Sequence, residues 1–261
     1  MPSRETIAMD AARAGADYAR RHFRTSLAVE RKSSKTDLVT DVDWTTQRRI
    51  VSTVEERFPD DEIVAEEGDE RKTVPDGWAW IVDPIDGTGN FVRGMPEWVT
   101  SVAVVREGEP EGAVNVAPAL GDTYRATPTG ATRNGAPISV SDRTDPETFL
   151  VAPTLRWHAA DGAAIGTLAR TIVERFGELR RLGSAQLTFS LVASGALDAA
   201  VSFDPRPNAW DTVAGAYLVE RAGGTVTDLE GNRWTPDGRG IVASNGEAHE
   251  TVVSAVRSVV E

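Results

Sequence analysis

Apolar residues recur at helical spacing in the first 60 positions of the chain and fall into short strand-like runs after them. The spacing predicts an amphipathic helix over residues 5–23 and a second helix over residues 41–58. Thr40 or Asp41 would cap the second helix, and Pro59 would end it. The stripe predicted to be buried in that helix consists of Trp44, Ile50, Val51 and Val54.

The following 80 residues carry the signals of β-strands separated by turns. The predicted strands are Glu62–Ala65, Trp78–Val82, Thr100–Val105, Ala113–Val116 and Asp122–Ala126. Residues 130–137 are rich in Gly, Thr, Asn and Pro, a composition that predicts a loop.

After about residue 146 the chain alternates between the two kinds of element. Strands are predicted at Phe149–Val151, Leu179–Leu182, Ala199–Phe203, Val226 and Ile241–Ala243, and helices over residues 161–176, 185–194, 211–222 and 247–260. An α+β first half therefore precedes an α/β second half. We expect an N-terminal part (residues 1–145) and a C-terminal part (residues 146–261) that pack as one compact unit.

The composition excludes several classes of protein. The 261 residues include 28 Lys+Arg and 40 Asp+Glu, a net charge of −12, which argues against a nucleic-acid partner. No cysteine is present, so disulfides, thiolate zinc sites and cysteine nucleophiles are excluded. No run approaches the ~18 apolar residues of a membrane span, and the N-terminus does not resemble a secretory signal, so we expect a cytoplasmic protein without a membrane partner.

The basic residues are almost all arginine, because only three of the 28 are lysine. Two explanations stay open: a GC-rich genome that encodes Arg in place of Lys, or a halophilic protein whose carboxylates keep its surface hydrated in a salty cytoplasm. The acids are scattered rather than grouped in blocks, which disfavours an acidic surface for a basic partner.

The most informative segment is Asp83-Pro84-Ile85-Asp86-Gly87-Thr88, which follows the apolar run that starts at Trp78. Two carboxylates that converge at a strand end suit a hard divalent cation such as Mg²⁺. If a helix starts near Thr88, its free N–H groups would suit a phosphate. Taken alone, Asp-x-x-Asp-Gly is equally typical of a turn in which Asp caps the backbone.

Three further acidic positions are each ambiguous in isolation. Glu66 and Glu67 follow a predicted strand, Asp43 lies at a predicted helix start, and Asp211 opens an apolar helix after Trp210. Solvated surface explains the first pair, and helix capping explains the other two. The co-occurrence of all of them in this order is the specific signal.

In these motifs the sequence resembles the inositol monophosphatases, Mg²⁺-dependent and Li⁺-sensitive sugar phosphatases that are related to fructose-1,6-bisphosphatase. The resemblance runs from about residue 5 to residue 258. It is carried by Asp37–Thr40 through Asp43, Glu66-Glu67, Asp83–Thr88 with Asn90-Phe91, Gly183–Ala185, Trp210-Asp211 and Ala222–Gly224. It implies a layered α-β-α-β-α sandwich with the site in a cleft between its two parts, and a homodimer.

The resemblance also implies roles for individual residues, with two or three Mg²⁺ ions in each site. Glu66, Asp83 and the carbonyl of Ile85 would hold the first ion, and a weaker third would sit near Glu66. The second ion would be held by Asp83, Asp86 and Asp211. Asp43 and Thr88, assisted by Glu66, would orient and deprotonate the attacking water, and the N–H groups of Gly87 and Thr88 would grip the phosphate.

The substrate is the least determined part of the interpretation. By resemblance, the sugar-contacting residues are Gly183, Ser184, Ala185, Asp204 and Asp211. Arg180, Arg181 and Arg206 lie beside the same region, and a basic residue there, Arg181 or Arg206 in the test of this hypothesis, would hold the second phosphate of a bisphosphate. The leading hypothesis is inositol-1-phosphate, with fructose 1,6-bisphosphate as a further substrate. The alternatives are a fructose-1,6-bisphosphatase, a 3′-phosphonucleotide phosphatase and, more distantly, a non-catalytic regulator that binds a phosphorylated ligand.

The remaining candidates for chemistry are ordinary structural residues. The three histidines have no zinc-site spacing, and the chain has no nucleophile elbow, P-loop or dinucleotide fingerprint.

Gly89 departs from the family pattern, in which Thr is common, and the segment over residues 155–178 is short compared with animal members. Lys32 matches a family position near the catalytic centre, and Trp210 is expected to position Asp211.

Overall fold

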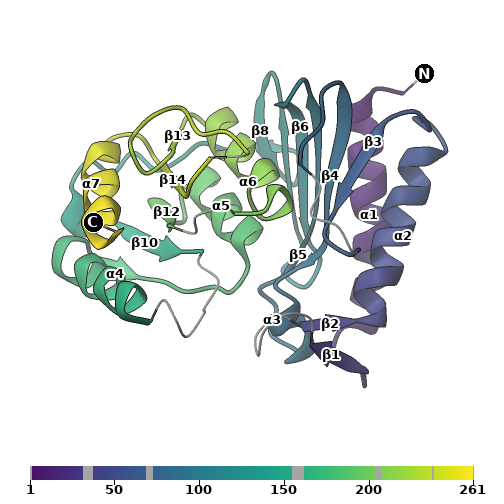
Figure 1. Cartoon of the computed structure of the whole chain (residues 1–261), viewed down its shortest axis with the longest axis horizontal. Helices are drawn as coiled ribbons and strands as arrows, with labels where there is room; N and C mark the ends of the chain where they lie inside the picture. The colour runs from purple at the N-terminus through teal and green to yellow at the C-terminus, as the bar shows by residue number, and fades with distance from the viewer. Residues whose placement is uncertain are drawn as a thin grey trace.

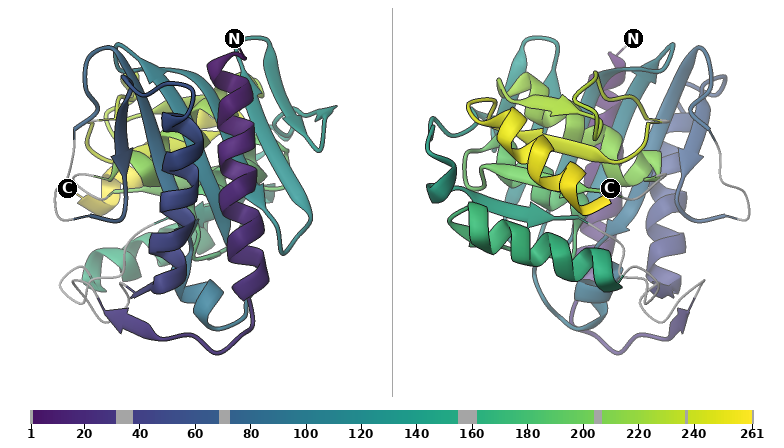
Figure 2. Two further views of the ribbon diagram at one scale, coloured as in Figure 1. Left: turned by 90° about the vertical axis from the view of Figure 1, so that its right-hand side faces the viewer. Right: turned by 60° about the vertical axis from the view of Figure 1, so that its left-hand side comes forward.

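The elements of the chain stack in five alternating layers (Figure 1). The computed structural model describes residues 2–31, 38–68, 73–154, 162–203, 207–236 and 238–260. Helices α1 (Arg4–His22) and α2 (Asp41–Glu55) form the first layer and lie side by side on the outer face of a seven-stranded sheet (Figure 2). Helices α5 (Ala185–Ala193) and α6 (Ala209–Arg221) form the middle layer. A five-stranded sheet follows, and α4 (Gly162–Arg175) and α7 (His249–Val260) cover its far side. The predicted α-β-α-β-α sandwich is confirmed.

The seven-stranded sheet follows the chain order from β3 to β9. Its strands are β3 (Glu62–Ala65), β4 (Trp78–Asp86), β5 (Val99–Arg106), β6 (Glu109–Ala117), β7 (Asp122–Thr127), β8 (Gly130–Arg133) and β9 (Ala136–Pro137). Only the β3–β4 pair is parallel.

Strand periodicity decides which side chains of β4 face the middle layer. Trp80 and Val82 pack into the apolar cluster under α1, whereas Ala79 and Ile81 pack into the cluster that contains α6. Because successive side chains of a strand point to opposite faces, Asp83 falls on the α6 side with Ile81. The sheet therefore carries this carboxylate into the interior of the sandwich.

The five-stranded sheet has the order β11-β10-β12-β14-β13. Its strands are β10 (Leu150–Pro153), β11 (Glu178–Leu179), β12 (Ala199–Ser202), β13 (Thr225–Thr227) and β14 (Ile241–Ser244). A 3-10 turn (Pro146–Thr148) precedes β10 in the segment between the two sheets. The division into parts at residues 145 and 146 falls in this segment and stays a prediction.

Arg4 anchors the first helix to the edge of the sheet. Its guanidinium makes two hydrogen bonds of 2.8 Å to Asp61, and the indole N–H of Trp80 donates to the same carboxylate at 2.8 Å. The guanidinium carbon also lies 4.2 Å from the ring centre of Phe58 and 4.1 Å from that of Trp78. This charge-assisted cluster fixes α1 on the sheet that carries the site.

The predicted loop over residues 130–137 is wrong, because these residues form the β8–β9 hairpin. Asn134 and Gly135 connect the two strands with φ angles of 54° and 82°. An Asn-Gly pair adopts this left-handed backbone readily, and a two-residue turn of that kind matches the twist of paired strands. The composition that indicated a loop was therefore that of a tight hairpin turn.

The prediction that Trp44 is buried is also wrong, since 40% of its surface is exposed. The buried face of α2 instead runs through Val42, Thr46, Ile50 and Val54, which follow one another at intervals of four residues. A residue two positions from Val42 and Thr46 points to the opposite side of a helix with 3.6 residues per turn.

The other predicted elements are present with small shifts at their ends. Strand β4 continues past Pro84 to Asp86, and β11 ends at Leu179 rather than Leu182. Two short strands were not predicted, β1 (Val29–Arg31) and β2 (Leu38–Thr40), which pair in antiparallel fashion. A short helix, α3 (Thr88–Val92), does begin at Thr88.

Candidate functional site

The end of β4 presents two carboxylates on either side of an irregularity in the sheet. Asp83 pairs with Ser101 of β5 and Asp86 pairs with Val99, so the register shifts between the two aspartates. Such a bulge bends a strand and re-aims its side chains. Both aspartates are buried, with 1% and 7% of their surface exposed.

Asp86 is held at the N-terminus of α5. Its carboxylate accepts hydrogen bonds from the Ser184 hydroxyl, from the Ala185 N–H at 3.2 Å and from the Gln186 N–H at 2.7 Å. Ser184 is also the N-cap of α5 and accepts from the Leu187 N–H. The start of a helix carries unpaired N–H groups, so it stabilises the negative charge of Asp86.

Asp211 reaches the same place from the first turn of α6. Oxygens of Asp83, Asp86 and Asp211 lie within 4.8 Å of one another. The side-chain amide of Asn208, the N-cap residue, donates to Asp211 Oδ2 at 2.9 Å. The three carboxylates, hereafter the acidic cluster, come from two elements that are far apart in the sequence.

The acidic cluster is electrostatically strained in the absence of a cation. Burial, followed by the charges of Glu66, Asp86 and Asp211, holds the pKa of Asp83 well above its usual range. Burial also raises the pKa of Asp86 to about 7, against the opposing effect of its hydrogen bond from Ser184. These shifts show that each added negative charge costs free energy here.

The donor set of the cluster fits a hard divalent cation. Asp83 Oδ1 is buried and accepts no hydrogen bond from the residues that the structure describes. The ligand atoms on offer are carboxylate oxygens, which Mg²⁺, Mn²⁺ and Ca²⁺ prefer over nitrogen and sulfur ligands. A bound cation would satisfy Asp83 Oδ1 and compensate the repulsion between the carboxylates.

Glu66 joins the cluster from the end of β3. Its N–H donates to the Val82 carbonyl at 3.1 Å, and its charge contributes to the raised pKa of Asp83. The next residue, Glu67, is held by Gln47 of α2, which donates to the Glu67 carbonyl at 2.7 Å and accepts from its N–H at 2.8 Å. The α2 helix thereby fixes the segment that carries Glu66.

Asp43 is fully buried and its two oxygens have different partners. Oδ2 accepts from the Thr40 N–H at 2.8 Å and from the Thr40 hydroxyl at 2.6 Å, as part of a capping box at the start of α2. The Thr88 hydroxyl lies 3.2 Å from Oδ1 and 3.0 Å from the carbonyl of Ile85. The capping explanation of Asp43 is therefore correct, and the same side chain also reaches the predicted catalytic threonine.

Gly87 occupies a position that no larger residue would fit. Its φ is 96°, and an added Cβ would lie 2.9 Å from the Glu97 carbonyl oxygen. The Asn90 side chain donates to the carbonyls of Glu97 and Leu182, both at 2.7 Å. Asn90 therefore ties the start of α3 to the segment that leads through Gly183 into α5.

The structure brings together most of the residues predicted from the sequence. The positions that surround or adjoin the acidic cluster are Asp43, Glu66, Asp83, Ile85, Asp86, Gly87, Thr88, Gly183, Ser184, Ala185 and Asp211. Asp204, Lys32 and Arg206 lie outside the residues that the structure describes.

Three residues that support the site were not singled out from the sequence: Gln47, Asn115 and Gln186. They share one signal, a side-chain amide next to a motif or within an apolar run. That signal is weak, because an amide on the surface looks the same in the sequence. Only the hydrogen-bond partners distinguish a supporting amide from a surface amide, and those partners lie on other helices and strands.

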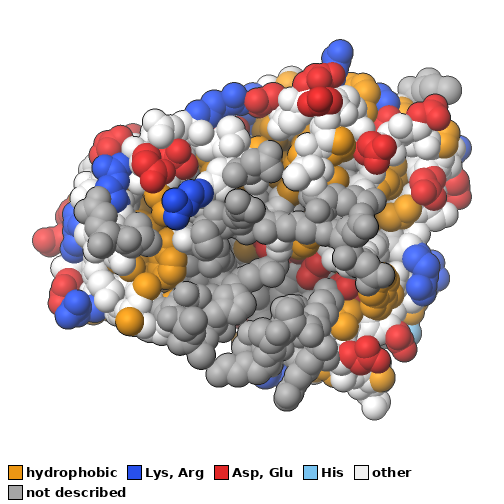
Figure 3. All heavy atoms as spheres, viewed as in Figure 1, with side chains coloured by type: hydrophobic (Ala, Val, Ile, Leu, Met, Phe, Trp, Pro, Cys, Tyr) orange, Lys and Arg blue, Asp and Glu red, His pale blue; other side chains and the backbone are white. Residues whose placement is uncertain are grey.

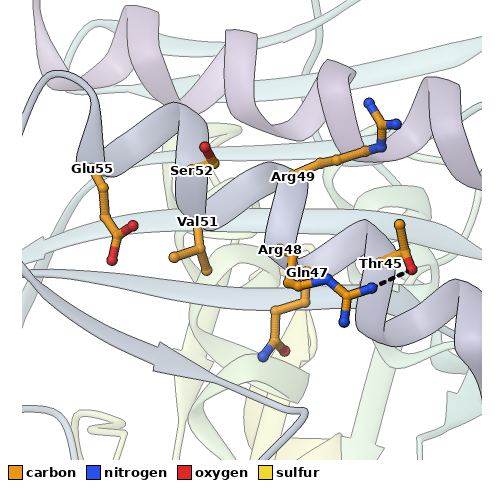
Figure 4. Close-up of a pocket in the computed structure, with 7 residues that line it drawn as sticks. All are labelled: Thr45, Gln47, Arg48, Arg49, Val51, Ser52 and Glu55. Carbon is orange, nitrogen blue, oxygen red and sulfur yellow. Dashed lines mark hydrogen bonds between the residues drawn. The ribbon is translucent and has the colours of Figure 1, made fainter.

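Other surface features do not coincide with the acidic cluster. Acidic and basic side chains are interspersed over the face in Figure 3. An open depression on α2 is lined by Thr45, Gln47, Arg48, Arg49, Val51, Ser52 and Glu55, and none of these is a predicted metal ligand (Figure 4). Among the helices of the described ranges, none is long and apolar enough to cross a membrane.

The layered fold and the buried carboxylates at its centre are those of a metal-dependent phosphatase. The chain belongs to the inositol monophosphatase family, whose model matches residues 2–261. It is a phosphoric monoester hydrolase by this membership.

The relatives differ in their names. A fructose-1,6-bisphosphatase/inositol-1-monophosphatase of Thermotoga maritima is 38% identical over 237 residues, which cover 89% of this chain and 88% of the relative. The Nus factor SuhB of Escherichia coli is 32% identical, with coverage of 96% and 94%. A solved IMPase structure from Thermotoga maritima superposes with a TM-score of 0.89 at 35% identity, covering 98% of each chain.

Proposed function

We propose that this protein hydrolyses inositol-1-phosphate in a Mg²⁺-dependent reaction. The observation that carries the proposal is the acidic cluster, in which a buried oxygen of Asp83 accepts no hydrogen bond from the described residues. Glu66, Asp83 and the Ile85 carbonyl would hold a first ion, and Asp83, Asp86 and Asp211 a second, with a weaker third near Glu66. When bound, these ions would lower the pKa of the attacking water and stabilise negative charge on the phosphoryl oxygens.

The chain's own side chains orient and deprotonate that water. Asp43 Oδ2 is occupied by Thr40, whereas Oδ1 lies 3.2 Å from the Thr88 hydroxyl. The Thr88 hydroxyl is therefore fixed between a carboxylate and the Ile85 carbonyl. In this arrangement the Thr88 oxygen would accept a hydrogen bond from the water while the Thr88 hydroxyl donates to Asp43, so a proton lost by the water would pass to Thr88 as the Thr88 proton passes to Asp43, with Glu66 assisting.

The phosphate and the polyol would contact different groups around the cluster. The backbone N–H groups of Gly87 and Thr88, at the start of α3, would donate to the phosphoryl oxygens. Asp211 and the segment Gly183–Ala185 would contact the hydroxyl groups of the substrate, with Asp204 as a further acceptor. This division follows the resemblance of these positions to the family's substrate contacts.

A substrate panel tests the proposal directly. Phosphate release from inositol-1-phosphate, fructose 1,6-bisphosphate and a 3′-phosphonucleotide should be measured with Mg²⁺ and with EDTA, at low and high KCl. We expect Mg²⁺-dependent release that is fastest for inositol-1-phosphate and absent in D211N. A wild-type protein that releases no phosphate and shows no Mg²⁺-dependent shift in melting temperature would support the alternative, a non-catalytic regulator that binds a phosphorylated ligand.

A second candidate activity is hydrolysis of a bisphosphate, which Arg181 favours. Arg181 is exposed to solvent, the charge of Asp86 acts on its guanidinium, and one of its guanidinium nitrogens lies 3.5 Å from the position that a Cβ on Gly183 would take. A guanidinium beside the substrate segment suits a second phosphate. R181A should then raise KM for fructose 1,6-bisphosphate far more than KM for inositol-1-phosphate. The matched control is R180A, since Arg180 pairs with Glu178 on the surface.

We propose in addition that the protein is a cytoplasmic homodimer with no nucleic-acid or membrane partner. The net charge of −12 supports the absence of a nucleic-acid partner. Light scattering after size-exclusion chromatography tests the dimer, and retention on immobilised nucleic acid at low salt would contradict the partner proposal.

A further inference from the structure

A buried pair of amide side chains lies beside the acidic cluster without belonging to it. Asn115 of β6 and Gln186 of α5 have no exposed surface. Asp83, Ser101 and Asn115 are register partners on three successive strands, so their side chains share one face of the sheet. Buried amides cost free energy unless they are hydrogen-bonded, so their partners show what they do.

Gln186 connects the N-terminus of α5 to the first turn of α6. Its N–H donates to Asp86 Oδ2 at 2.7 Å, and its side-chain Nε2 donates to the Trp210 carbonyl at 2.6 Å. Trp210 is the residue before Asp211. One residue therefore makes hydrogen bonds both to one carboxylate of the cluster and to the backbone adjacent to another.

Asn115 holds Gln186 in this conformation. Its Nδ2 lies 3.1 Å from Gln186 Oε1, 3.2 Å from the Gln186 carbonyl and 3.0 Å from Ser190 Oγ. The Gln186 side chain is thus fixed at its carbonyl by the first sheet while its amide reaches α6. Rotation of the Gln186 amide would turn its oxygen toward the Trp210 carbonyl oxygen and lose the hydrogen bond to α6.

The Trp210 carbonyl would have a hydrogen-bond donor within α6 even without the Gln186 amide. Trp210 is the second residue of α6, and the carbonyl at that position accepts the N–H four residues later within the helix. The Gln186 amide therefore adds a second hydrogen bond to a carbonyl that already has one. Its effect is to fix the position of the α6 start relative to α5.

We propose that Gln186 is a positioning residue that sets the separation of Asp211 from Asp86 and thereby the cation affinity of the cluster. The proposal rests on the metal-dependent function proposed above. Gln186 touches neither the reacting atoms nor the ion. It acts through the Trp210 carbonyl, and Asn115 acts through Gln186. Residues that orient metal ligands in this way change metal affinity by about 10–100-fold when they are replaced.

The test compares two variants of the same helix in the full-length protein. Q186L keeps the side-chain bulk and removes the amide. S190A removes a buried hydroxyl that bonds Asn115 and the Gln186 carbonyl, but it does not touch Trp210. Mg²⁺ binding is measured by calorimetry, and the rise in melting temperature on adding saturating Mg²⁺ is measured for each variant against its own metal-free state.

We expect Q186L to bind Mg²⁺ at least about tenfold more weakly than the wild type, and S190A to bind within about twofold of it. The metal-induced rise in melting temperature should be smaller in Q186L than in the wild type, and unchanged in S190A. Each variant is compared with its own metal-free state, so a general loss of stability does not affect this difference. Q186M repeats the test if Q186L does not fold. Wild-type affinity in the folded Gln186 variant, or equal losses in both variants, overturns the proposal. A wild-type protein that binds no Mg²⁺ overturns the proposed function as well, whereas binding without phosphate release contradicts only the catalytic assignment.

Discussion

Replacing Asp211 with Asn removes one negative charge from the acidic cluster and keeps an oxygen that can accept from Asn208. Two unit charges 4.8 Å apart repel by about 3.5 kcal/mol at an effective dielectric constant of 20. Asp211 is partly exposed, so solvent screening reduces the effect on stability to about 1–2 kcal/mol. D211N should therefore be more stable than the wild type in EDTA at pH 8, although it is inactive.

The stability advantage of D211N should increase with pH. Asp83 and Asp86 have pKa values above those of the unfolded chain, so the metal-free protein loses stability as pH rises through these values. The advantage of D211N is largest where Asp86 is ionised, above its pKa of about 7. It shrinks as the pH falls toward 5, because a protonated Asp86 no longer repels Asp211.

Thermal melting in EDTA measures the effect of repulsion between the carboxylates, and thermal melting with Mg²⁺ measures the loss of the metal site. In EDTA at pH 8, D211N should melt about 2–8 °C higher than the wild type. With Mg²⁺ at 100 times its dissociation constant, the wild type gains about 2.7 kcal/mol, and D211N should lose most of that gain. The matched control is D142N, which removes an exposed charge outside the site. Two results would refute the role of repulsion between the carboxylates. One is a melting temperature of D211N in EDTA below that of the wild type, and the other is an equal rise in melting temperature in D142N.

Four further outcomes are expected. D43N should lower kcat by about 10²–10⁴-fold with little change in KM, since Asp43 holds the Thr88 hydroxyl. R4M should lower the free energy of unfolding by about 2–4 kcal/mol at neutral pH and leave kcat/KM unchanged. Burial opposes ionisation of Asp61, but its bonds from Arg4 and Trp80 lower its pKa, so the deficit of R4M should shrink as pH falls below 4. Burial lowers the pKa of His249, which costs stability as pH falls below 6.5, and H249Q should show a shallower loss there. If the protein is halophilic, activity and melting temperature should both rise with KCl.

Each of these outcomes has a measurement that can contradict it. Steady-state kinetics of D43N should be accompanied by a melting curve, and wild-type kcat would exclude Asp43 from proton transfer. Urea unfolding of R4M at several pH values tests the Asp61 argument, which a deficit independent of pH would overturn. For His249, equal slopes of melting temperature against pH in both proteins would show that another group titrates. Destabilisation by KCl would leave genomic composition as the explanation of the arginine excess.

The sequence by itself determined most of the elements and the set of acidic residues, and its resemblance to the inositol monophosphatases implied the layered fold class. Local patterns carry that information: apolar spacing predicts helices and strands, and Asp83–Thr88 together with Trp210-Asp211 is a specific combination. The same local patterns gave the wrong result at Trp44 and over residues 130–137. A tryptophan near an apolar stripe was assigned to it, although helix geometry places it on the opposite side.

Only the tertiary structure decided what the ambiguous polar residues do. The local pattern at Asp43 indicates only a helix cap, and the resemblance implied a catalytic role, but only the fold places the Thr88 hydroxyl beside the second oxygen of Asp43. Gln186 bonds partners that lie 71 and 24 residues away in the chain. Periodicity shows which face of an element is buried but not which element covers it, so partners at such separations cannot be read from it. The sequence therefore identified the carboxylates, and the packing of α5 and α6 against the first sheet made them one site.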